Sequence, residues 1–391
     1  MFFVDKPYLS DSFKAMLVEH RIPVVDTPGA RGMNLLPGTL VIPEEEARRR
    51  LLCGDERPYS TSENCLEWIG KQLPGSALHE SIRSFKDKAR FRRETAELFP
   101  RFFFAEFALD ELAGVDVLTF PGRVVLKPAV GFFSMGVHVV SSQDEWDEAV
   151  ASICANLAEC ETLYPSEVVE WGRFIVEEYI AGDEFALDAY YDEAGTAQVM
   201  GILHHHFASV DDVSDRVYCT SKQIVADHLE AFRVFAQTVG SCLRIKNFPV
   251  HIELRRQEDG RLVPIEFNPM RFGGWCTTGD LTRAAFKYDP YVAYHLNRPP
   301  DWTELLASKG DEIHSLVVLD NSTGWAGEAI ESFDYEAVAG AFEKTLELRE
   351  VDYRRFPVFG FLLTETRADR TDELDRILHN DLRSFTTKKK A

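Results

Sequence analysis

Residues 249–268 run PVHIELRRQEDGRLVPIEFN, and this stretch predicts a β-hairpin because two alternating segments flank an Asp-Gly pair. Asp259 and Gly260 favour a two-residue type I′ turn, which needs a positive φ angle at both residues. Such a turn pairs Glu258 with Arg261 and thereby sets every other pair along the two strands. The sequence therefore predicts which side chains of this hairpin lie opposite each other.

The predicted register brings two carboxylates face to face. Counting outward from the turn in single steps places Glu253 opposite Glu266 and His251 opposite Asn268, with Arg255 on the same polar face. The other face is apolar, as in a half-buried antiparallel pair, and carries Val250, Ile252, Leu254, Ile265 and Phe267. Carboxylates opposed at roughly 5 Å between Cβ atoms repel each other unless a cation lies between them. Two carboxylates and an amide oxygen suit Mg²⁺, whereas a solvated polar face is the alternative interpretation.

A loop framed by glycines lies upstream of this hairpin. Residues 122–140 predict a strand, a loop and a second strand, with Lys127 near the end of the first strand and Gly131, Ser134 and Gly136 in the loop. Glycine lets backbone N–H groups approach phosphate oxygens closely, and lysine adds a point charge. The spacing matches neither a Walker P-loop nor a dinucleotide-binding fingerprint. The loop is therefore either an ordinary turn or a phosphate-binding loop of another kind.

A third segment, residues 173–191, lies between the loop and the hairpin. Glu177 and Glu178 interrupt an apolar strand, and an alternating strand follows Gly182. By itself this segment is a strand-turn-strand unit with charged edges. The occurrence of all three segments in this order weighs against the bland interpretation of each.

These three segments resemble the ATP-grasp superfamily, and in particular its carboxylate–amine ligases, over about residues 85–275. The resemblance implies an α/β (α+β) fold, in which an ATP-grasp core follows a small N-terminal α/β domain, the pre-ATP-grasp domain, and precedes a C-terminal lobe. It also implies an ATP site formed by two lysines, the glycine loop and the third segment. The residues are Lys88, Lys127, Gly131, Ser134, Gly136, Glu177, Glu178, Ile180 and Glu184.

The resemblance assigns a role to each part of this site. Lys88, in the Asp-Lys step that opens the region, joins the second lysine in offsetting phosphate charge. Glu177 would contact the adenine amino group, and backbone groups of Glu178 and Ile180 would bind the adenine edge. Glu184, seven residues after Glu177, would hold the ribose hydroxyls.

The hairpin corresponds to the metal-binding element of the family. Glu253, Glu266 and Asn268 would be ligands of two Mg²⁺ ions bound to the triphosphate, and the register derived from the Asp-Gly turn agrees with this assignment. Arg271 would be the catalytic arginine that stabilises the transition state. The spacer Asn268-Pro-Met-Arg271 is one residue longer than in many members, which puts this role of Arg271 in question.

The implied activity is that of an ATP-dependent carboxylate–amine ligase, acting on a substrate of the amino acid or peptide type. The carboxylate would form an acylphosphate with release of ADP, and an amine would then displace phosphate. An ATP-grasp carboxylase, a phosphotransferase and a regulatory module that binds ATP without turnover remain alternatives. The identity of the acid and of the amine cannot be deduced from the sequence.

The composition fits a packed, acidic enzyme that acts on small molecules. The chain has 391 residues, 45% of them hydrophobic, and a net charge of −21, which disfavours nucleic acid and anionic membranes as partners. The expected partners are small-molecule acids and amines. Association of the chain into a homodimer is a further option. The seven cysteines, without C-x-x-C spacing, point to reduced thiols and a cytoplasmic location. We expect no membrane span and no signal peptide.

Three parts are expected along the chain: an N-terminal α/β domain over residues 1–80, an ATP-grasp core over 81–295 and a C-terminal lobe over 296–391. Residues 60–64 favour a helix cap, with a substrate-side loop as the alternative. The expected helices are Ser10–Glu19 with Ser10 or Asp11 as N-cap, Lys86–Phe99, Ala226–Cys242 and Asp372–Leu382, and the expected strands include Phe2–Asp5, Ile22–Asp26, Gly38–Ile42 and Phe356–Leu363.

Two further groups of residues are ambiguous. His204, His205 and His206 end an apolar strand, and because neighbours on a strand face opposite ways, the three cannot all bind one ion. They form either a polar strand end or, in part, a contact to the acyl substrate. Arg216 and Lys222 follow in a segment rich in Asp and Ser, where a basic residue could meet the γ-phosphate or the substrate carboxylate.

Overall fold

The computed structural model describes residues 1–54, 56–131, 136–160, 170–209, 212 and 214–390, and only the backbone of residues 156–160 and 170. The chain forms two compact units. The first contains residues 1–182, 189–198 and 234–275, and the second contains 183–188, 199–233 and 276–391. Four elements contribute residues to both units: β9 (Asp183–Tyr191), β10 (Ala197–His206), α8 (Lys222–Leu243) and the 3₁₀ helix Gly274–Cys276. The three-part division expected from the sequence stays a prediction.

The first unit opens with a small parallel sheet in the order β3-β2-β1-β4, as the βαβ pattern predicts. Ser10 is the N-cap of the first helix, because its side chain accepts a hydrogen bond from the N–H of Phe13. The strands are β1 (Phe2–Phe3), β2 (Val24–Val25), β3 (Val41–Ile42) and β4 (Tyr59–Ser60), and the helices are α1 (Asp11–Glu19), α2 (Pro28–Arg31), α3 (Glu44–Cys53) and α4 (Leu66–Gln72).

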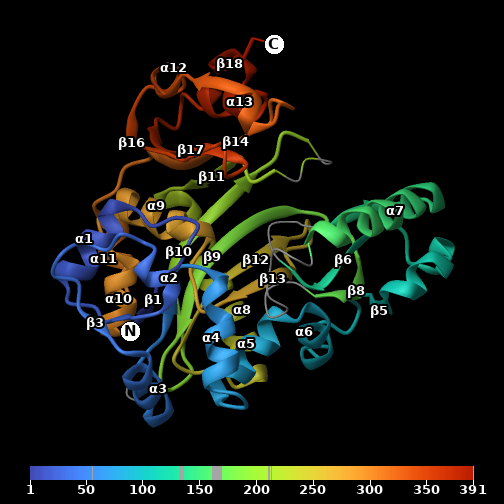
Figure 1. Cartoon of the computed structure of the whole chain (residues 1–391), viewed down its shortest axis with the longest axis horizontal. Coiled ribbons are helices and arrows are strands. Elements are labelled where there is room, and N and C mark those ends of the chain that lie inside the picture. Colours follow the sequence, from blue (N-terminus) through green and yellow to red (C-terminus); the bar gives the residue numbers. More distant parts are fainter. Residues whose placement is uncertain (55, 132–135, 161–169, 210–211, 213, 391) are drawn as a thin grey trace. The chain divides into compact units, whose positions relative to one another are not determined.

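A second, antiparallel sheet of the first unit has the order β5-β8-β6-β7, with β5 (Phe104–Ala108), β8 (Glu170–Glu178), β6 (Val124–Val130) and β7 (His138–Val140). One face packs on α7 (Gln143–Cys160), which lies along the sheet in Figure 1 and contributes the buried Trp146. On the other face Ala89 packs against Ala129 and Ile175. Alternation along β6 and β8 thus separates an apolar face from the face that carries Lys127 and Glu177.

The prediction of one long helix over Lys86–Phe99 is wrong. The structure has two helices instead, α5 (Ala77–Lys86) and α6 (Lys88–Glu94), separated by Asp87. Asp87 has an extended backbone (φ −86°, ψ 101°), and its carboxylate accepts a hydrogen bond from the N–H of Arg90, so it caps the second helix. The break places Lys88 in the first turn of α6, directly after the cap.

The predicted hairpin exists as β12 (Phe248–Arg256) and β13 (Leu262–Pro269), but its turn differs from the prediction. The N–H of Gln257 donates to the carbonyl of Arg261, and the N–H of Gly260 donates to the carbonyl of Gln257, both over 2.9 Å. The loop therefore has three residues, and among them only Gly260 has a positive φ, 83°. A three-residue loop with glycine in the left-handed position is a common alternative to the type I′ turn.

The extra loop residue shifts the strands by one, and a bulge restores the predicted register. Next to the turn, Leu254 pairs with Pro264, where the prediction has Ile265. The register then shifts between Glu253 and Leu254, and beyond this point Glu253 lies opposite Glu266 and His251 opposite Asn268. The predicted pairing at the polar end of the hairpin is confirmed, although two deviations cancel to produce it.

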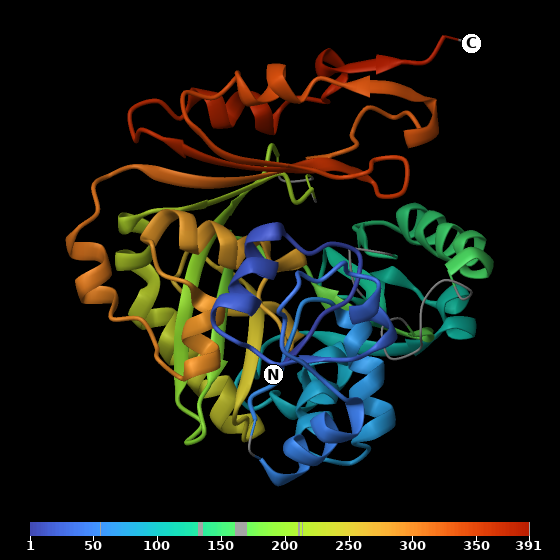
Figure 2. The same ribbon diagram turned by 60° about the vertical axis from the view of Figure 1, so that its left-hand side comes forward.

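The second unit is built on antiparallel strands that run β10-β11-β14-β17-β16. In Figures 1 and 2 the helices α12 (Tyr335–Ala339) and α13 (Asp372–Leu378) lie on one face of this sheet, and Val338 and Ile377 pack in its core. The helix expected over Asp372–Leu382 ends earlier, at Leu378. The other elements are β11 (Val217–Thr220), β14 (Ile313–Asp320), β15 (Ile330–Phe333), β16 (Thr345–Glu350), β17 (Val358–Thr366), β18 (Thr386–Lys388), α9 (Thr277–Phe286), α10 (Pro290–Leu296) and α11 (Trp302–Ala307), and the 3₁₀ helices of the chain are Glu63–Cys65, Leu109–Gly114, Val117–Thr119, Gly274–Cys276, Gly327–Ala329 and Arg383–Phe385.

Candidate nucleotide and metal site

Lys127 and Glu177 come together on the sheet of the first unit. Val125 lies opposite Glu177 and Lys127 lies opposite Ile175, so the lysine and the glutamate are diagonal neighbours on one face. Lys127 Nζ lies 2.6 Å from Glu177 Oε2, and Arg92 Nε of α6 lies 2.5 Å from Glu177 Oε1. Both carboxylate oxygens of Glu177 are therefore paired with cations.

This cluster is buried, and its charges determine its ionisation. Glu177 is 2% exposed. Burial by itself raises the pKa of Glu177, but Arg92 and Lys127 outweigh burial and bring the pKa to about 2. Burial also lowers the pKa of Lys127, against the opposing effect of Glu177. At neutral pH the carboxylate is ionised and compensates two buried cations.

Replacement of Glu177 with glutamine is expected to lower the free energy of unfolding at neutral pH by about 3–5 kcal/mol, because it leaves a buried guanidinium and ammonium without their counter-charge. The folded-state pKa of Glu177 is depressed from 4.5 to about 2, so its stabilisation is present above about pH 4.5 and is lost as the pH falls toward 2. Urea unfolding at a series of pH values measures this. The difference between wild type and variant should shrink below pH 4.5, and a constant difference would contradict the assignment.

The hairpin carries the second cluster of charges. Lys88 Nζ lies 2.8 Å from Glu266 Oε1 and donates to the carbonyl of Gly131 over 3.4 Å. Across the hairpin, Asn268 Nδ2 donates to Glu253 Oε1 over 3.3 Å. Burial alone raises the pKa of Glu266, but nearby lysines lower it below its ordinary value, and Glu266 in turn raises the pKa of Lys88. The opposed carboxylates are thus stabilised by an ammonium on one side and an amide on the other.

The donor set of the hairpin fits Mg²⁺. In the part of the chain that the structure describes, no group of three or more His, Cys, Asp or Glu side chains forms a metal site by itself. Mg²⁺ does not require one, because it commonly takes one or two carboxylates and completes its coordination with water and phosphate oxygens. Glu253 and Glu266 are directly opposed and Asn268 adds an amide oxygen, so these three residues could hold Mg²⁺ together with a triphosphate.

Arg271 is held by a residue of the N-terminal region. Its Nη2 and Nε atoms lie 2.8 and 3.2 Å from Glu63 Oε1, and Lys86 Nζ forms an ion pair with the other oxygen of Glu63. Lys86 also donates to the carbonyl of Gly131 over 2.8 Å. Burial by itself raises the pKa of Glu63, but Lys86 and Arg271 together bring it to about 2. Glu63 therefore joins the arginine after the hairpin to the base of the glycine loop.

The longer spacer before Arg271 has a structural explanation. Met270 adopts the left-handed conformation, with φ at 62°, and its side chain is fully buried. Its N–H donates to the carbonyl of Pro249 over 2.9 Å, and its carbonyl accepts from the N–H of Ser60 over 2.7 Å. The extra residue is thus absorbed by a kink at Met270 that is tied to the loop before Glu63, and the kink presents Arg271 to that carboxylate.

Sequence reasoning missed Glu63 as a site residue. Ser62 does cap a 3₁₀ helix over Glu63–Cys65, as the cap interpretation predicts. The Glu63 side chain, however, is 6% exposed and pairs with Arg271, which lies 208 positions later in the chain. The sequence around Glu63 does not indicate that this acid is buried, because the partner of its carboxylate lies far away in the chain.

The predicted adenine-binding segment lies at the end of β8. The N–H of Glu178 donates to the carbonyl of Phe103 over 3.1 Å, and the carbonyl of Ile180 accepts from Arg255 Nη1 over 2.5 Å. In the glycine loop, Gly136 has a φ of 68° and its Cα lies against Trp171, where a side chain would be crowded. Ser134 lies outside the described residues.

Glu184 belongs to the second unit, where it contacts one of the three histidines. His205 Nδ1 lies 2.9 Å from Glu184 Oε1, whereas His204 and His206 project to the opposite face of β10, where their rings lie 4.3 Å apart. The expected alternation is confirmed. Arg216 pairs with Asp320 over 2.6 Å, and Lys222 donates to the carbonyl of Lys309 over 3.2 Å.

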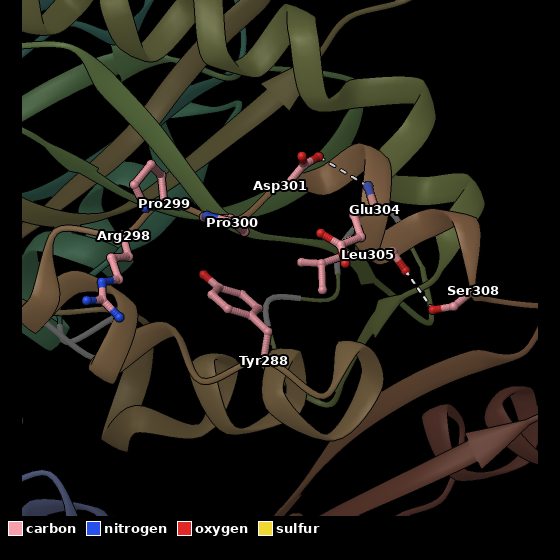
Figure 3. A pocket seen from close by; sticks show the side chains of 8 residues that line it. All are labelled: Tyr288, Arg298, Pro299, Pro300, Asp301, Glu304, Leu305 and Ser308. Atoms are coloured by element: carbon pink, nitrogen blue, oxygen red, sulfur yellow. Dashed lines mark hydrogen bonds between the residues drawn. The ribbon is translucent and has the colours of Figure 1, made fainter.

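A surface cavity of about 420 Å³ occurs in the second unit (Figure 3). It is formed by the segment between α9 and α10, the loop between α10 and α11, and α11 with the residues that follow it. Its lining residues are Tyr288, Arg298, Pro299, Pro300, Asp301, Glu304, Leu305 and Ser308. None of the predicted site residues lines this cavity.

Comparison with known proteins identifies a family domain in part of the chain. Residues 120–279 match the model of a family described as the ATP-grasp domain. A search of curated proteins found no match. No helix in the described part of the chain has the length and apolar character needed to cross a bilayer.

Solved structures resemble the whole chain. An L-amino acid ligase from Bacillus licheniformis has a TM-score of 0.66 at 17% identity, over 100% of this chain and 98% of its own. The ADP complex of PurK, N5-carboxyaminoimidazole ribonucleotide synthetase, has a TM-score of 0.61 at 15% identity, over 97% and 95% of the two chains. Phosphoribosylglycinamide synthetase from Anaerococcus prevotii has a TM-score of 0.58 at 12% identity, over 100% and 99%. The mixed α/β fold expected from the sequence is confirmed, and this chain carries an ATP-grasp domain over residues 120–279.

Proposed function

We propose that this chain joins a carboxylic acid, of the amino acid type, to an amine at the expense of ATP, with ADP and phosphate as products. The observation that carries the proposal is the opposed pair Glu253 and Glu266 on the hairpin, with Lys88 on one carboxylate and Asn268 on the other. Carboxylates directly opposite each other destabilise a sheet, and Lys88 contacts only Glu266 of this pair, which leaves room for a further cation between the two acids. In an ATP-grasp domain the fitting cation is Mg²⁺ bound to the nucleotide.

The residues around the hairpin would neutralise and position the triphosphate. Glu253, Glu266 and Asn268 would hold two Mg²⁺ ions, which when bound would neutralise charge on the β- and γ-phosphates. Lys88 and Lys127 would offset charge on the α- and β-phosphates. In such phosphoryl transfers the protein contributes positioning and electrostatic stabilisation more than covalent chemistry.

The reaction would proceed in two steps, transfer of the γ-phosphoryl group to the acid and displacement of phosphate by the amine. An oxygen of the substrate carboxylate attacks the γ-phosphorus, and the bond to the bridging β–γ oxygen breaks, which gives an acylphosphate and ADP. The amine nitrogen then attacks the acyl carbon, the tetrahedral intermediate expels phosphate, and the nitrogen loses a proton. Arg271, fixed by Glu63, would stabilise the negative charge that develops on the acyl oxygen.

The nucleotide base and sugar would be bound by the third segment. Glu177 would face the adenine amino group, backbone groups of Glu178 and Ile180 would bind the ring edge, and Glu184 would accept from the ribose hydroxyls. The glycine loop, with Gly131, Ser134 and Gly136, would cover the phosphates. The ion pairs of Glu177 with Arg92 and Lys127 support a rigid carboxylate at this position.

The comparisons support C–N bond formation but leave the substrates open. Among the similar structures, the name of the L-amino acid ligase describes ligation, whereas the name of a biotin carboxylase from Campylobacter jejuni, with a TM-score of 0.58 and 10% identity, describes carboxylation. A cytoplasmic location is part of the proposal. The cysteines that the structure describes with their side chains are free thiols, which fits a reducing compartment.

A phosphate-release screen tests the proposed function. Pairs of amino acids and small acids are incubated with the protein and Mg-ATP, with and without hydroxylamine, which traps an acylphosphate as a hydroxamate. We expect phosphate release that depends on the acid, together with hydroxamate formation. ADP accompanied by a stable phosphoester would instead indicate a phosphotransferase, bicarbonate-dependent release a carboxylase, and tight ATP binding without turnover a regulatory module.

A further inference from the structure

The three consecutive histidines of β10 have separate environments. His204 and His206 share one face of the strand, where the ring of His204 stacks on Phe185 at a centroid distance of 4.7 Å. His205 lies on the other face, and its ring stacks on Tyr218 at 4.0 Å with an interplanar angle of 16°. His205 is 3% exposed. It is therefore a fixed, buried imidazole and not part of a solvated strand end.

Both ring nitrogens of His205 face hydrogen-bond acceptors. Nδ1 lies 2.9 Å from Glu184 Oε1, and Nε2 lies 3.0 Å from the backbone carbonyl of Ser214. An ionised carboxylate and a carbonyl can only accept, so both contacts are satisfied when both ring nitrogens carry hydrogen. The contact to Glu184 therefore needs a hydrogen on Nδ1, which donates to the carboxylate.

We propose that His205 is a positioning residue that orients Glu184 for recognition of the nucleotide ribose. This inference rests on the proposed nucleotide-binding function. A glutamate side chain loses rotamer entropy when a ligand fixes it. Because His205 already fixes Glu184, this entropic cost is not added when the nucleotide binds. A carboxylate has about four lone-pair sites, so a hydrogen bond from His205 is compatible with acceptance from ribose hydroxyls.

The stacking of the ring supports this role. Phe207 and Tyr218 contact the imidazole of His205, each at a centroid distance of 4.0 Å. Tyr218 is itself fixed, because its hydroxyl donates to Asp215 over 2.6 Å. The aromatic neighbours hold the plane of the imidazole, and the plane determines the direction in which Nδ1–H points at Glu184.

Ribose discrimination is the measurement that separates positioning from a purely structural role. Dissociation constants for ADP and 2′-deoxy-ADP are determined by calorimetry with the full-length protein. We expect the wild type to prefer ADP about tenfold, because a hydroxyl bound to a charged acceptor contributes on this scale. His205→Phe keeps an aromatic ring between Phe207 and Tyr218 but cannot donate to Glu184. It should weaken ADP binding and bring the two constants within about twofold of each other.

Two further variants complete the test. His205→Gln retains an N–H donor, so it should restore part of the preference for ADP. His204→Phe changes the adjacent residue on the opposite face, away from Glu184, and should keep the wild-type preference. Melting temperatures of all variants identify any that fail to fold, and His205→Gln serves if His205→Phe does not fold.

The outcomes distinguish this inference from the proposed function. If the wild type binds no ADP, the proposed function fails and this inference with it. If the wild type binds ADP with a preference over 2′-deoxy-ADP, and the folded His205 variants keep the wild-type ratio, the inference alone is overturned. Loss of the ratio in both His204→Phe and His205→Phe would mean a general disturbance of the strand and would also overturn it.

Discussion

Glu266→Gln is expected to abolish turnover, with a fall in kcat on the order of 10³-fold or more, because metal-held charge neutralisation contributes several kcal/mol to phosphoryl transfer. The change removes one of the two opposed carboxylates and also the anionic partner of Lys88, which lies 2.8 Å away. Glutamine has nearly the same shape, so the hairpin should keep its fold. Phosphate release measures turnover, and calorimetry with and without Mg²⁺ measures nucleotide binding.

Glu258→Gln is the matched control for this variant. Glu258 lies in the exposed loop of the same hairpin, so the substitution removes one carboxylate from the hairpin without touching the polar face near Glu253. Activity should stay close to that of the wild type. If Glu266→Gln still binds nucleotide with the Mg²⁺ dependence of the wild type, the metal assignment of the hairpin is wrong.

Arg271→Ala is expected to lower kcat by about 10²-fold or more, since removal of a single group that stabilises transition-state charge typically has this effect. The guanidinium lies against Glu63, and the carboxylates of Glu253 and Glu266 also act on its pKa, which is raised above the ordinary value despite burial. Steady-state kinetics should show kcat reduced more than the KM for ATP. A change within about twofold would remove Arg271 from the mechanism.

Glu63 provides an internal check on the arginine. Glu63→Gln removes the charge that holds Arg271 and Lys86, and we expect kcat to fall while Arg271 itself remains present. Residues that act as one unit give non-additive effects, so Glu63→Gln combined with Arg271→Lys should be hardly worse than either change alone. Arg261→Ala, at an exposed arginine of the hairpin, is the control and should leave the kinetics unchanged.

The sequence predicted local features well where the chemistry was local. The Ser10 cap follows from a side chain and a backbone N–H three residues apart, and the alternation of His204, His205 and His206 follows from the pleat of a strand. Helix boundaries were less accurate. Asp87 ends one helix and caps the next, and a continuous polar and apolar pattern across it gave no clear sign of the break.

In the hairpin the predicted pairing of Glu253 with Glu266 is correct, although the predicted two-residue turn is not. Asp259 and Gly260 indicated a turn at the right place, but the competition between a two-residue and a three-residue loop depends on small differences in backbone twist. The bulge next to Glu253 then restored the pairing with Glu266. The polar residues must share one face, and this demand on the register outweighed the local preference of the turn.

By itself the sequence determined the order of the three segments and the pairing at the polar end of the hairpin, because spacing along a strand or around a turn is a local property. Only the tertiary structure decided which charges meet. Lys88 reaches Glu266 across 178 positions, and Glu63 reaches Arg271 across 208. Such pairs depend on how separate helices, loops and sheets pack, and each buried charge requires a partner that no local pattern in the chain specifies.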